Sequence, residues 1–404
     1  MKKSNDKDNT ISCVICIIII SLFFTNLLSG LNMLPQTLGD NISNTFKGII
    51  FLCLIYCIPM LFQSINKKMI LYILGIILFF LLQCLFFYDN KYFFENFLVH
   101  VTTIFPIVIC FLAINNYKLL LDKLIKISFG ISVITLVLFL IFKNNMFSNG
   151  YSMGFANIMI FPSNILIYYL FNNKLKKMHK LCAIILFIAN FFIILAVGSR
   201  GALINIMFFL LYMIFFEQKN KVRKYIFCLS TIIVFLIIMA YSKEITVALS
   251  QISSKIGLNS RTLNLLLSNN INHDSGRREL WAIVLSEICV SPFSIRGINA
   301  DYLLIGIYSH NFIIELLYEF GILLGVPFII YIIYAIFKTV ISKNNYYTNL
   351  LKILLFNFFP LILWSATIWT SMFFWIWLLL FDYSKIKCNA EYGENLEEDG
   401  NDKK

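Results

Sequence analysis

Charged side chains are scarce in this sequence. Asp, Glu, Lys and Arg together account for 13% of its 404 residues, about half the share that is usual in soluble domains. Hydrophobic residues account for 59%, and the mean hydropathy is +0.81. This composition excludes an ordinary soluble domain. It predicts an all-α polytopic membrane protein, because helices satisfy their backbone hydrogen bonds within lipid.

Motifs for soluble phosphate ligands are also missing. The sequence contains no glycine-rich Walker loop and no dinucleotide-binding fingerprint, so a nucleotide substrate is not indicated. The single Asp-x-Asp motif, Asp6-Lys7-Asp8, lies in a polar N-terminal stretch that we expect to be disordered. The net charge of +12 is explained by cytoplasmic loops facing anionic lipid, and no basic-aromatic surface indicates nucleic acid as a partner.

Cysteine usage excludes a disulfide scaffold outside the membrane. Of the ten cysteines, only Cys289 is expected on the outer side, so no intramolecular disulfide framework can form there. The pairs Cys13/Cys16 and Cys53/Cys57 have ligand-like spacing but lie in apolar surroundings. We interpret them as packed thiols and predict neither a metal nor a cofactor.

Apolar runs approaching or reaching the length of a bilayer span, about 20 residues, recur along the chain. The last of them covers 30 residues, 353–382, which is long for one helix. We interpret it as two helices with a bend on the outer side near Thr367–Ser371, which gives about 12 spans. The runs are 11–28, 48–62, 69–87, 97–114, 127–142, 155–171, 181–197, 201–216, 225–241, 312–337 and 353–382.

The distribution of Lys and Arg predicts the orientation of these spans. With twelve spans both termini lie on one side, and that side holds 23 of the 33 Lys and Arg residues. Because cytoplasmic loops carry the excess of positive charge, we expect both termini in the cytoplasm. The expected organisation is spans one to nine within residues 1–241, a large outer loop over 242–309, spans ten to twelve within 310–383, and a disordered acidic tail over 384–404.

The outer loop between the ninth and tenth spans is far longer than the other connections, and such a long connection is usually functional. Residues 244–257 and 260–270 are predicted to form amphipathic helices near the membrane surface. A third helix is expected to begin near Asp274 or Ser275 and to end before Pro292. Its expected buried stripe consists of Trp281, Val284, Leu285 and Ile288.

Three arginines on the outer side suggest an anion site. The third loop helix begins with Arg277 and Arg278, although cations at a helix N-terminus oppose the macrodipole. Free backbone N–H groups and a guanidinium at one place favour an anion, and a phosphate fits the planar arginine fork best. Arg200 lies in a tight turn between the seventh and eighth spans, where positive residues are disfavoured. The alternatives are solvated, headgroup-bound or snorkelling arginines.

Polar groups also follow one another along the start of the tenth span. Asn311, Glu315 and Glu319 are spaced i, i+4, i+8 and therefore share one face of a helix. We expect both carboxylates to face a polar cavity, either paired with arginine or protonated. The alternative is a structural ion pair, which we favour for Glu319. His100, near the outer end of the fourth span, is interpreted as a packing histidine.

Three motifs, in this order, resemble the O-antigen ligase and polymerase family, whose multi-span enzymes ligate or polymerise lipid-linked glycans outside the cytoplasmic membrane. The resemblance covers roughly residues 190–337 and includes the large loop between spans nine and ten. The motifs are Ser-Arg-Gly at Ser199–Gly201, Ser-Gly-Arg-x-x-Leu-Trp at Ser275–Trp281, and His-Asn followed by Glu-x-Gly at His310, Asn311, Glu319 and Gly321.

The resemblance implies a metal-independent, inverting glycosyltransferase in the bacterial cytoplasmic membrane. Its substrate would be a polyprenyl-pyrophosphate-linked oligosaccharide repeat unit of a capsule, exopolysaccharide or O-antigen. Arg200 and Arg277 would bind the pyrophosphate, and His310 would orient or deprotonate the acceptor hydroxyl or assist the phosphate. Membrane lipids would surround it, and a flippase and a chain-length regulator of the same pathway would be its protein partners. Further substrate-binding residues would be Arg278, Arg296, Asn311, Glu315 and Glu319.

Other functions stay open at this point. A ligase would share these motifs and transfer the glycan to an acceptor lipid or protein. A flippase for the same lipid-linked sugars would also be a basic twelve-span protein. Many such transporters, however, show repeated halves and sites near the membrane midplane, whereas here the polar groups gather at the outer rim. A scaffold without chemistry would leave the carboxylates and the outer arginines unexplained.

Overall fold

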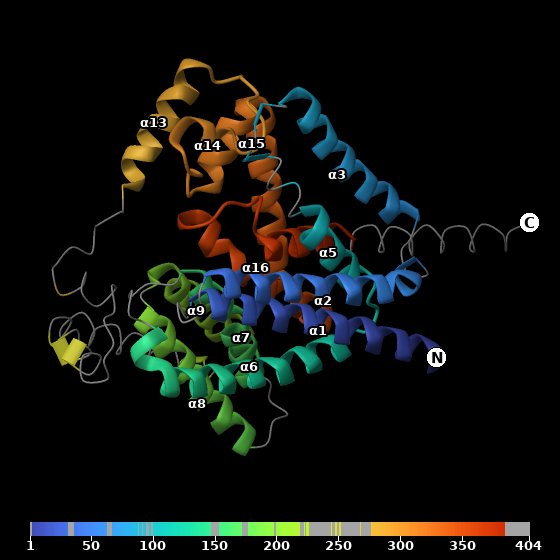
Figure 1. Cartoon of the computed structure of the whole chain (residues 1–404), viewed down its shortest axis with the longest axis vertical. Helices are drawn as coiled ribbons and strands as arrows, with labels where there is room; N and C mark the ends of the chain where they lie inside the picture. Colours follow the sequence, from blue (N-terminus) through green and yellow to red (C-terminus); the bar gives the residue numbers. More distant parts are fainter. Residues whose placement is uncertain are drawn as a thin grey trace, which may run out of the picture.

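The computed structural model of the chain is helical throughout its regular structure (Figure 1). No strand occurs in the ranges it describes, which confirms the all-α class. These ranges are residues 2–30, 36–62, 67–87, 100–146, 153–171, 177–197, 199–218 and 276–383, with isolated residues between 89 and 97 and between 222 and 267.

The N-terminal half contains α1 to α9, and the C-terminal part contains α13 to α16. A last unlabelled helix, Met372–Tyr383, follows α16. The first set is α1 (Lys2–Gly30), α2 (Gln36–Phe62), α3 (Lys67–Phe86), the π-helical turn η1 (His100–Ile104), α5 (Phe105–Leu112), α6 (Tyr117–Met146), α7 (Met153–Phe171), α8 (Lys177–Val197), α9 (Arg200–Tyr212) and η2 (Met213–Glu217). The second set is α13 (Arg277–Val290), α14 (Ala300–Ile305), α15 (Phe312–Ile341) and α16 (Tyr346–Trp364).

These helices indicate a membrane protein. Among the described residues seven helices are long and apolar enough to cross a bilayer, namely α1, α6, α7, α8, α9 with η2, α15 and α16. Shorter apolar helices cover parts of three further expected spans. In the part of the expected fourth span that is described from residue 100 onward, the helical segments are η1 and the eight-residue α5, and residues 226–241 of the expected ninth span lie outside the described residues. The count of twelve is therefore not confirmed.

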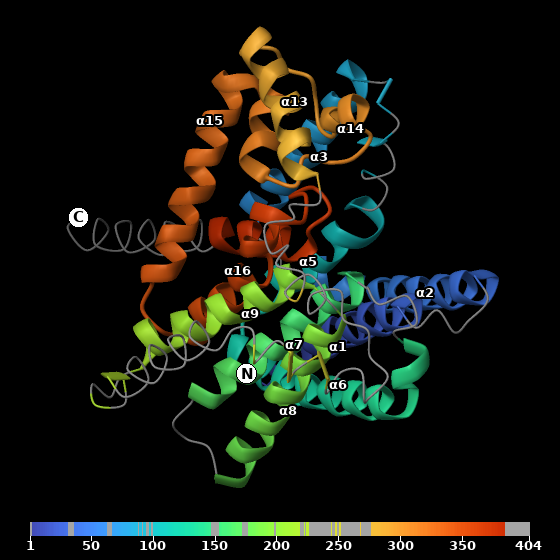
Figure 2. The same ribbon diagram turned by 90° about the vertical axis from the view of Figure 1, so that its left-hand side faces the viewer.

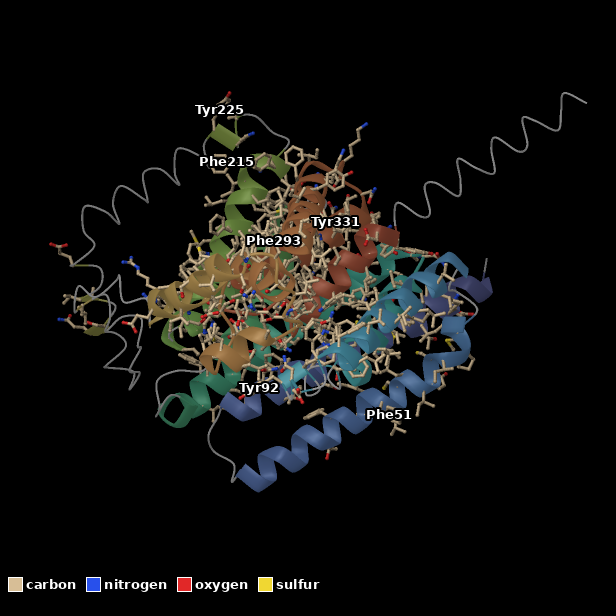
Figure 3. All side chains as sticks on the ribbon, turned by 90° about the horizontal axis from the view of Figure 1, so that it is seen from above. Phe51, Tyr92, Phe215, Tyr225, Phe293 and Tyr331 are labelled. Atoms are coloured by element: carbon tan, nitrogen blue, oxygen red, sulfur yellow. The ribbon has the colours of Figure 1, made fainter. Side chains whose placement is uncertain are left out.

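Apolar side chains also cover much of the outer surface. Phe51 on α2 is 60% exposed and Phe215 in η2 is 39% exposed, and the two lie at opposite margins of the molecule in Figure 3. Such exposure is what hydrocarbon, rather than water, favours. In the interior, by contrast, the largest fully buried side chains include Trp369 and Trp377 of the C-terminal region.

The helices form two packed groups. In the first, α1 lies against α2, α6 and α7, while α7 also packs against α8 and α9 (Figure 1). In the second, α13 and α14 lie beside α15 at one end of the molecule (Figure 2). The helix α16 contacts both α9 and α15, and so connects the groups. The polar residues singled out from the sequence lie around this connection.

The expectation of a disordered N-terminal stretch is wrong for Asp6-Lys7-Asp8. Helix α1 already begins at Lys2, and Asp8 is only 2% exposed. Its Oδ2 accepts a hydrogen bond of 2.9 Å from the backbone N–H of Asn116, directly before α6. A carboxylate is favoured there because the first N–H groups of a helix have no partner within the helix.

The long C-terminal apolar run divides as expected. Helix α16 ends at Trp364, residues 365–371 are not helical, and the next helix begins at Met372. The expected bend near Thr367–Ser371 is therefore confirmed, although the side of the membrane on which it lies is not shown.

The tenth span is not one continuous helix, contrary to the prediction for residues 312–337. Gly321 has φ 64° and ψ 176°, which breaks α15 into two halves. A Cβ on Gly325 would lie 2.7 Å from the carbonyl oxygen of Leu316, although residues nine positions apart in an unbroken helix are separated by roughly 13 Å. The second half therefore folds back along the first. Residues 322–341 alone are long enough, at about 30 Å, to cross a bilayer.

The loop residues 291–299 fill this break. The backbone N–H groups of Arg296 and Gly297 donate to the carbonyl oxygen of Glu319 at 2.8 and 3.0 Å, and that of Ile322 donates to Pro292 at 2.8 Å. These bonds satisfy backbone groups that the interrupted helix leaves open, which a break inside an apolar segment requires. The predicted amphipathic helices over 244–257 and 260–270, and the tail over 384–404, lie almost entirely outside the described residues.

Candidate functional site

His310 lies directly before α15 and beside the start of α13. Its pKa is lowered to about 4, chiefly by burial and then by the positive charge of Arg277, while a hydrogen bond with the backbone of Ser365 opposes the shift. The imidazole is therefore neutral near pH 7. The Trp281 indole N–H of α13 donates to the carbonyl oxygen of Ser309, so α13 packs directly beside the His-Asn motif.

Ser365, the residue after α16, connects the Ser-Arg-Gly motif to this site. Its carbonyl oxygen accepts a hydrogen bond of 2.8 Å from the Tyr308 hydroxyl, and the Tyr308 ring lies 4.1 Å from the His310 ring. A Cβ on Gly201 would lie 3.1 Å from the Ser365 Oγ, so the start of α9 packs directly on Ser365. The Ser-Arg-Gly turn, in which Arg200 is half-buried, therefore lies on the segment that Tyr308 also contacts.

An ion pair joins α16 to η2, the continuation of α9, at the ends of these helices that lie away from Ser365. Nζ of Lys352, near the start of α16, lies 2.8 Å from Oε1 of Glu217 at the end of η2. Nζ also donates to the carbonyl oxygen of Ser342, which follows α15. Helices α9 and α16 are therefore antiparallel. The Ser-Arg-Gly turn and the His-Asn motif lie at one end of this pair of helices, and the Glu217–Lys352 ion pair lies at the other.

The backbone of His310 is strained. Its φ is 56°, a left-handed conformation that costs a non-glycine residue on the order of 1–3 kcal/mol. The flanking residues hold it in place. The Trp281 indole N–H of α13 donates to the carbonyl oxygen of Ser309 at 2.6 Å, and the Asn311 side chain caps α15 by accepting from Ile313 N at 3.0 Å. His310 Nδ1 is buried and has no hydrogen-bond partner.

The two carboxylates of α15 are fully buried and differ in their partners. Glu319 accepts from the Asn299 backbone N–H through Oε1 and from the Trp369 indole N–H, at 2.7 Å, through Oε2. Glu315 accepts from the Thr367 hydroxyl through Oε1, while its Oε2 has no hydrogen-bond partner. Within the described ranges neither carboxylate pairs with an arginine. Both instead hold the turn between the last two helices.

Asp301 adds a third buried carboxylate. Its Oδ2 accepts a hydrogen bond of 2.7 Å from the Ser309 backbone N–H, and its Oδ1 accepts one of 3.0 Å from Tyr302. Burial raises the pKa of this carboxyl, and these hydrogen bonds oppose the rise. Asp301 thereby fixes the loop immediately before His310.

Arg296 is bound mainly to the protein backbone. Its Nη1 donates to the carbonyl oxygen of Tyr318 at 3.1 Å, and its Nη2 donates to those of Glu287 and Ser291 at 3.1 and 3.2 Å. Its guanidinium lies 4.5 Å from the Tyr318 ring centre. The geometry makes it a cap for the C-terminus of α13. Arg278, in contrast, is exposed on α13 next to Arg277.

Helix α13 begins and packs nearly as predicted. It starts at Arg277 after Gly276 and ends at Val290, before Pro292. Val284 and Ile288 are buried and Trp281 packs against them, but Leu285 is 43% exposed. The expected stripe is therefore wrong at Leu285, because residues one position apart cannot share the narrow face that α13 turns toward α15.

An apolar cavity of about 740 Å³ opens on the far side of Trp369, which is hydrogen-bonded to Glu319. It lies between α3, the second half of α15 and the last helix, and Phe320 and Trp369 form its wall next to Glu319. Gly75 of α3 contributes to the lining without a side chain. Such a space suits an aliphatic chain rather than a polar ligand.

Four residues that hold this site were not predicted to contribute to it: Asp301, Tyr308, Ser365 and Trp369. A signal existed for the last two, because Ser365-Ala-Thr-Ile-Trp369 is a polar interruption of an apolar run. For Asp301 the signal was a lone carboxylate close to the His-Asn motif. His100, interpreted as a packing residue, is buried between the rings of Phe80, Phe105 and Trp375.

Comparison with protein-family models, with curated proteins and with solved structures reveals no match for this chain. Function therefore has to be inferred from the site itself.

Proposed function

We propose that this chain is a polymerase of polyprenyl-pyrophosphate-linked oligosaccharide repeat units. It acts at the outer face of the bacterial cytoplasmic membrane, with both termini in the cytoplasm. One observation carries the proposal: α13 is hydrogen-bonded through Trp281 to Ser309, the residue before His310, and the Ser-Arg-Gly turn of α9 packs on Ser365 nearby. A neutral histidine, with Arg277 acting on it and Arg200 supplied from the neighbouring turn, would suit the transfer of a group away from a phosphate.

The proposed reaction is a single displacement at the anomeric carbon of the lipid-linked sugar. The bond from that carbon to the phosphate oxygen breaks, and a bond to the acceptor hydroxyl oxygen forms. The lipid pyrophosphate leaves with the bonding electron pair. Arg277 and Arg200 offset the charge that develops on it, as preorganised cations do in other transfer reactions.

His310 has the properties that the acceptor side requires. Its low pKa keeps the ring neutral, so that it can take the proton of the acceptor hydroxyl as the new bond forms. Nδ1 has an unused hydrogen-bonding capacity, which a bound hydroxyl would satisfy. The left-handed backbone of His310, held by its neighbours, preorganises the ring.

The apolar cavity supports a lipid-linked donor. Its volume of about 740 Å³ is in the range of ligand pockets, and its wall at Trp369 is hydrogen-bonded to Glu319. A polyprenyl chain in this cavity would bring its pyrophosphate toward the polar cluster. Glu315 and Glu319 then support the turn that carries Ser365, and Asn311 holds the start of α15 beside His310.

The test uses the purified protein with lipid-linked repeat units from the host and no second acceptor. A ladder of products with many repeats on a gel is expected, and it should disappear in Arg277→Ala. The matched control is Arg278→Ala, which removes the adjacent exposed guanidinium and should leave most of the ladder. If units stay single with the wild type, polymerisation is refuted. The same reaction with an acceptor lipid, or in sealed vesicles, then tests the ligase and the flippase.

A further inference from the structure

A row of aromatic rings leads away from His310. The ring centres of Tyr308 and His310 are 4.1 Å apart, those of Tyr302 and Tyr308 are 5.8 Å apart, and those of Tyr92 and Tyr302 are 5.1 Å apart. All four side chains are half-buried, so part of each remains exposed. The row therefore extends from the candidate site across α14 to the segment after α3, where Figure 3 labels Tyr92.

Backbone and side-chain hydrogen bonds fix this tyrosine row. The Tyr308 hydroxyl is bound to Ser365 at 2.8 Å. The Asn299 side chain, just before α14, donates to the carbonyl oxygen of Tyr92 at 3.4 Å. Asn90 donates to the carbonyl oxygen of Ile298 at 2.9 Å. Because both ends are fixed before any ligand binds, little conformational entropy would be lost on binding.

The chemistry of the row differs from that of the apolar cavity. Each ring offers a negative π face, which attracts the weakly positive C–H groups of a sugar, and each tyrosine also carries a hydroxyl that can bond to a sugar hydroxyl. The row carries no formal charge, whereas the guanidinium of Arg277 lies at its His310 end. A neutral or weakly charged saccharide suits the row, while a phosphate suits only that end.

We propose that Tyr92, Tyr302 and Tyr308 form a binding site for the acceptor saccharide. Sugars of the growing glycan lie along the row, and the terminal hydroxyl meets His310. This inference rests on the proposed function for its direction, because His310 defines which end of the row is reactive. It adds a glycan-binding site made of residues outside the three sequence motifs.

The experiment measures binding without transfer. Repeat-unit oligosaccharide is released from its lipid by mild acid and titrated onto the purified full chain, with saturation-transfer NMR as the readout. Tyr302→Ala is expected to weaken binding about tenfold, as loss of one aromatic contact predicts, and Tyr302→Phe should retain most of it. Tyr346→Ala, which removes a tyrosine that is 47% exposed at the start of α16, is the matched control and should bind like the wild type.

A second variant distinguishes a loss of saccharide binding from a folding defect. Tyr302→Leu keeps apolar volume between α14 and its neighbours but has no π face, and it should unfold at nearly the wild-type temperature while binding weakly. Equal binding by the wild type and the Tyr302→Leu and Tyr92→Ala variants would overturn the proposal. So would a wild-type protein that binds no oligosaccharide at millimolar concentration.

The two proposals fail in different ways. A wild type that forms a ladder while Tyr302→Leu binds normally refutes the tyrosine row and keeps the polymerase. Binding that depends on the row, in a protein that forms no ladder, supports the saccharide site and refutes polymerisation.

Discussion

The indole N–H of Trp369 donates a hydrogen bond of 2.7 Å to Oε2 of Glu319. Both side chains are fully buried, and the bond ties the turn after α16 to the first half of α15. It links two segments 50 residues apart in the sequence. This relationship gives Glu319 a structural role that differs from that of Glu315.

Glu319→Ala should therefore destabilise the protein strongly. It leaves the Trp369 indole N–H and the Asn299 backbone N–H without an acceptor, and each buried unsatisfied donor costs about 1–3 kcal/mol. Thermal unfolding in detergent should show a clear decrease in the midpoint. Glu279→Ala removes an exposed carboxylate of α13 and should change the midpoint little. Equal midpoints for the two variants would contradict the structural role.

Gly321→Ala tests the break in α15. The residue has φ 64°, and a Cβ would lie 2.9 Å from the Phe293 carbonyl carbon and 3.0 Å from its oxygen. The left-handed backbone and the short contacts both disfavour a side chain here, so Gly321→Ala should lower the free energy of unfolding by about 1–3 kcal/mol. Gly130→Ala is the control, since a Cβ there meets nothing within 4 Å and alanine favours a helix by up to about 1 kcal/mol. If Gly321→Ala left the free energy of unfolding unchanged, α15 would be a continuous helix.

Arg296 and Arg277 should respond differently to lysine. Arg296→Lys loses the planar fork that binds the carbonyl oxygens of Glu287, Ser291 and Tyr318, so the unfolding midpoint should fall. Its transfer rate per folded molecule should stay near that of the wild type. Arg277→Lys should instead lower the transfer rate by about 10²-fold, in line with the loss of a transition-state contact, with little change in the midpoint. The reverse pattern would assign the substrate to Arg296.

The low pKa of His310 predicts how activity depends on pH. Transfer should persist well below pH 6.5 and fall only as the pH approaches about 4, where the ring becomes protonated. Arg277→Ala removes one cause of the lowered pKa, so the His310 titration in this variant, followed by NMR, should move to higher pH. Burial remains, so the pKa should stay below the ordinary value.

The same shift affects stability in a defined direction. Because the folded pKa of His310 lies below the unfolded one, the unfolded chain binds more protons between about pH 4 and 6.5. The contribution of His310 is therefore complete above pH 6.5 and is lost as the pH falls through about 4. NMR titration of ¹⁵N-labelled histidine, with His310→Gln to assign the signal, checks the pKa directly. A midpoint near 6.5 would contradict the buried site.

Much of the fold class could be predicted from the sequence, because composition and run length depend on average properties. Polar residues or a proline interrupt the apolar sequence at three boundaries that could be predicted. These are the start of α15 at Phe312, the end of α13 before Pro292 and the bend after Trp364. The break at Gly321 was not. A glycine in an apolar run is common, and only the neighbouring loop shows that this one adopts a left-handed conformation.

The candidate site could be predicted in part. The sequence indicated Arg200, Arg277 and His310, and the structure brings their segments together around Ser365. It could not indicate that Arg296 would cap α13, because such a role depends on carbonyl oxygens that α13 and Tyr318 present only when folded. It also could not indicate the partners of Glu319, since both donors come from segments distant in sequence.

The broken helix α15 has a consequence for how the protein is made. Residues 292–297 leave the ribosome before Gly321, yet their carbonyl and N–H groups complete the break on both sides of it. The open backbone groups at the break are costly in lipid until that turn docks against them. Insertion of α15 is therefore coupled to docking of a segment that was made earlier. A substitution that delays this step would lower the yield of inserted protein without altering the finished molecule.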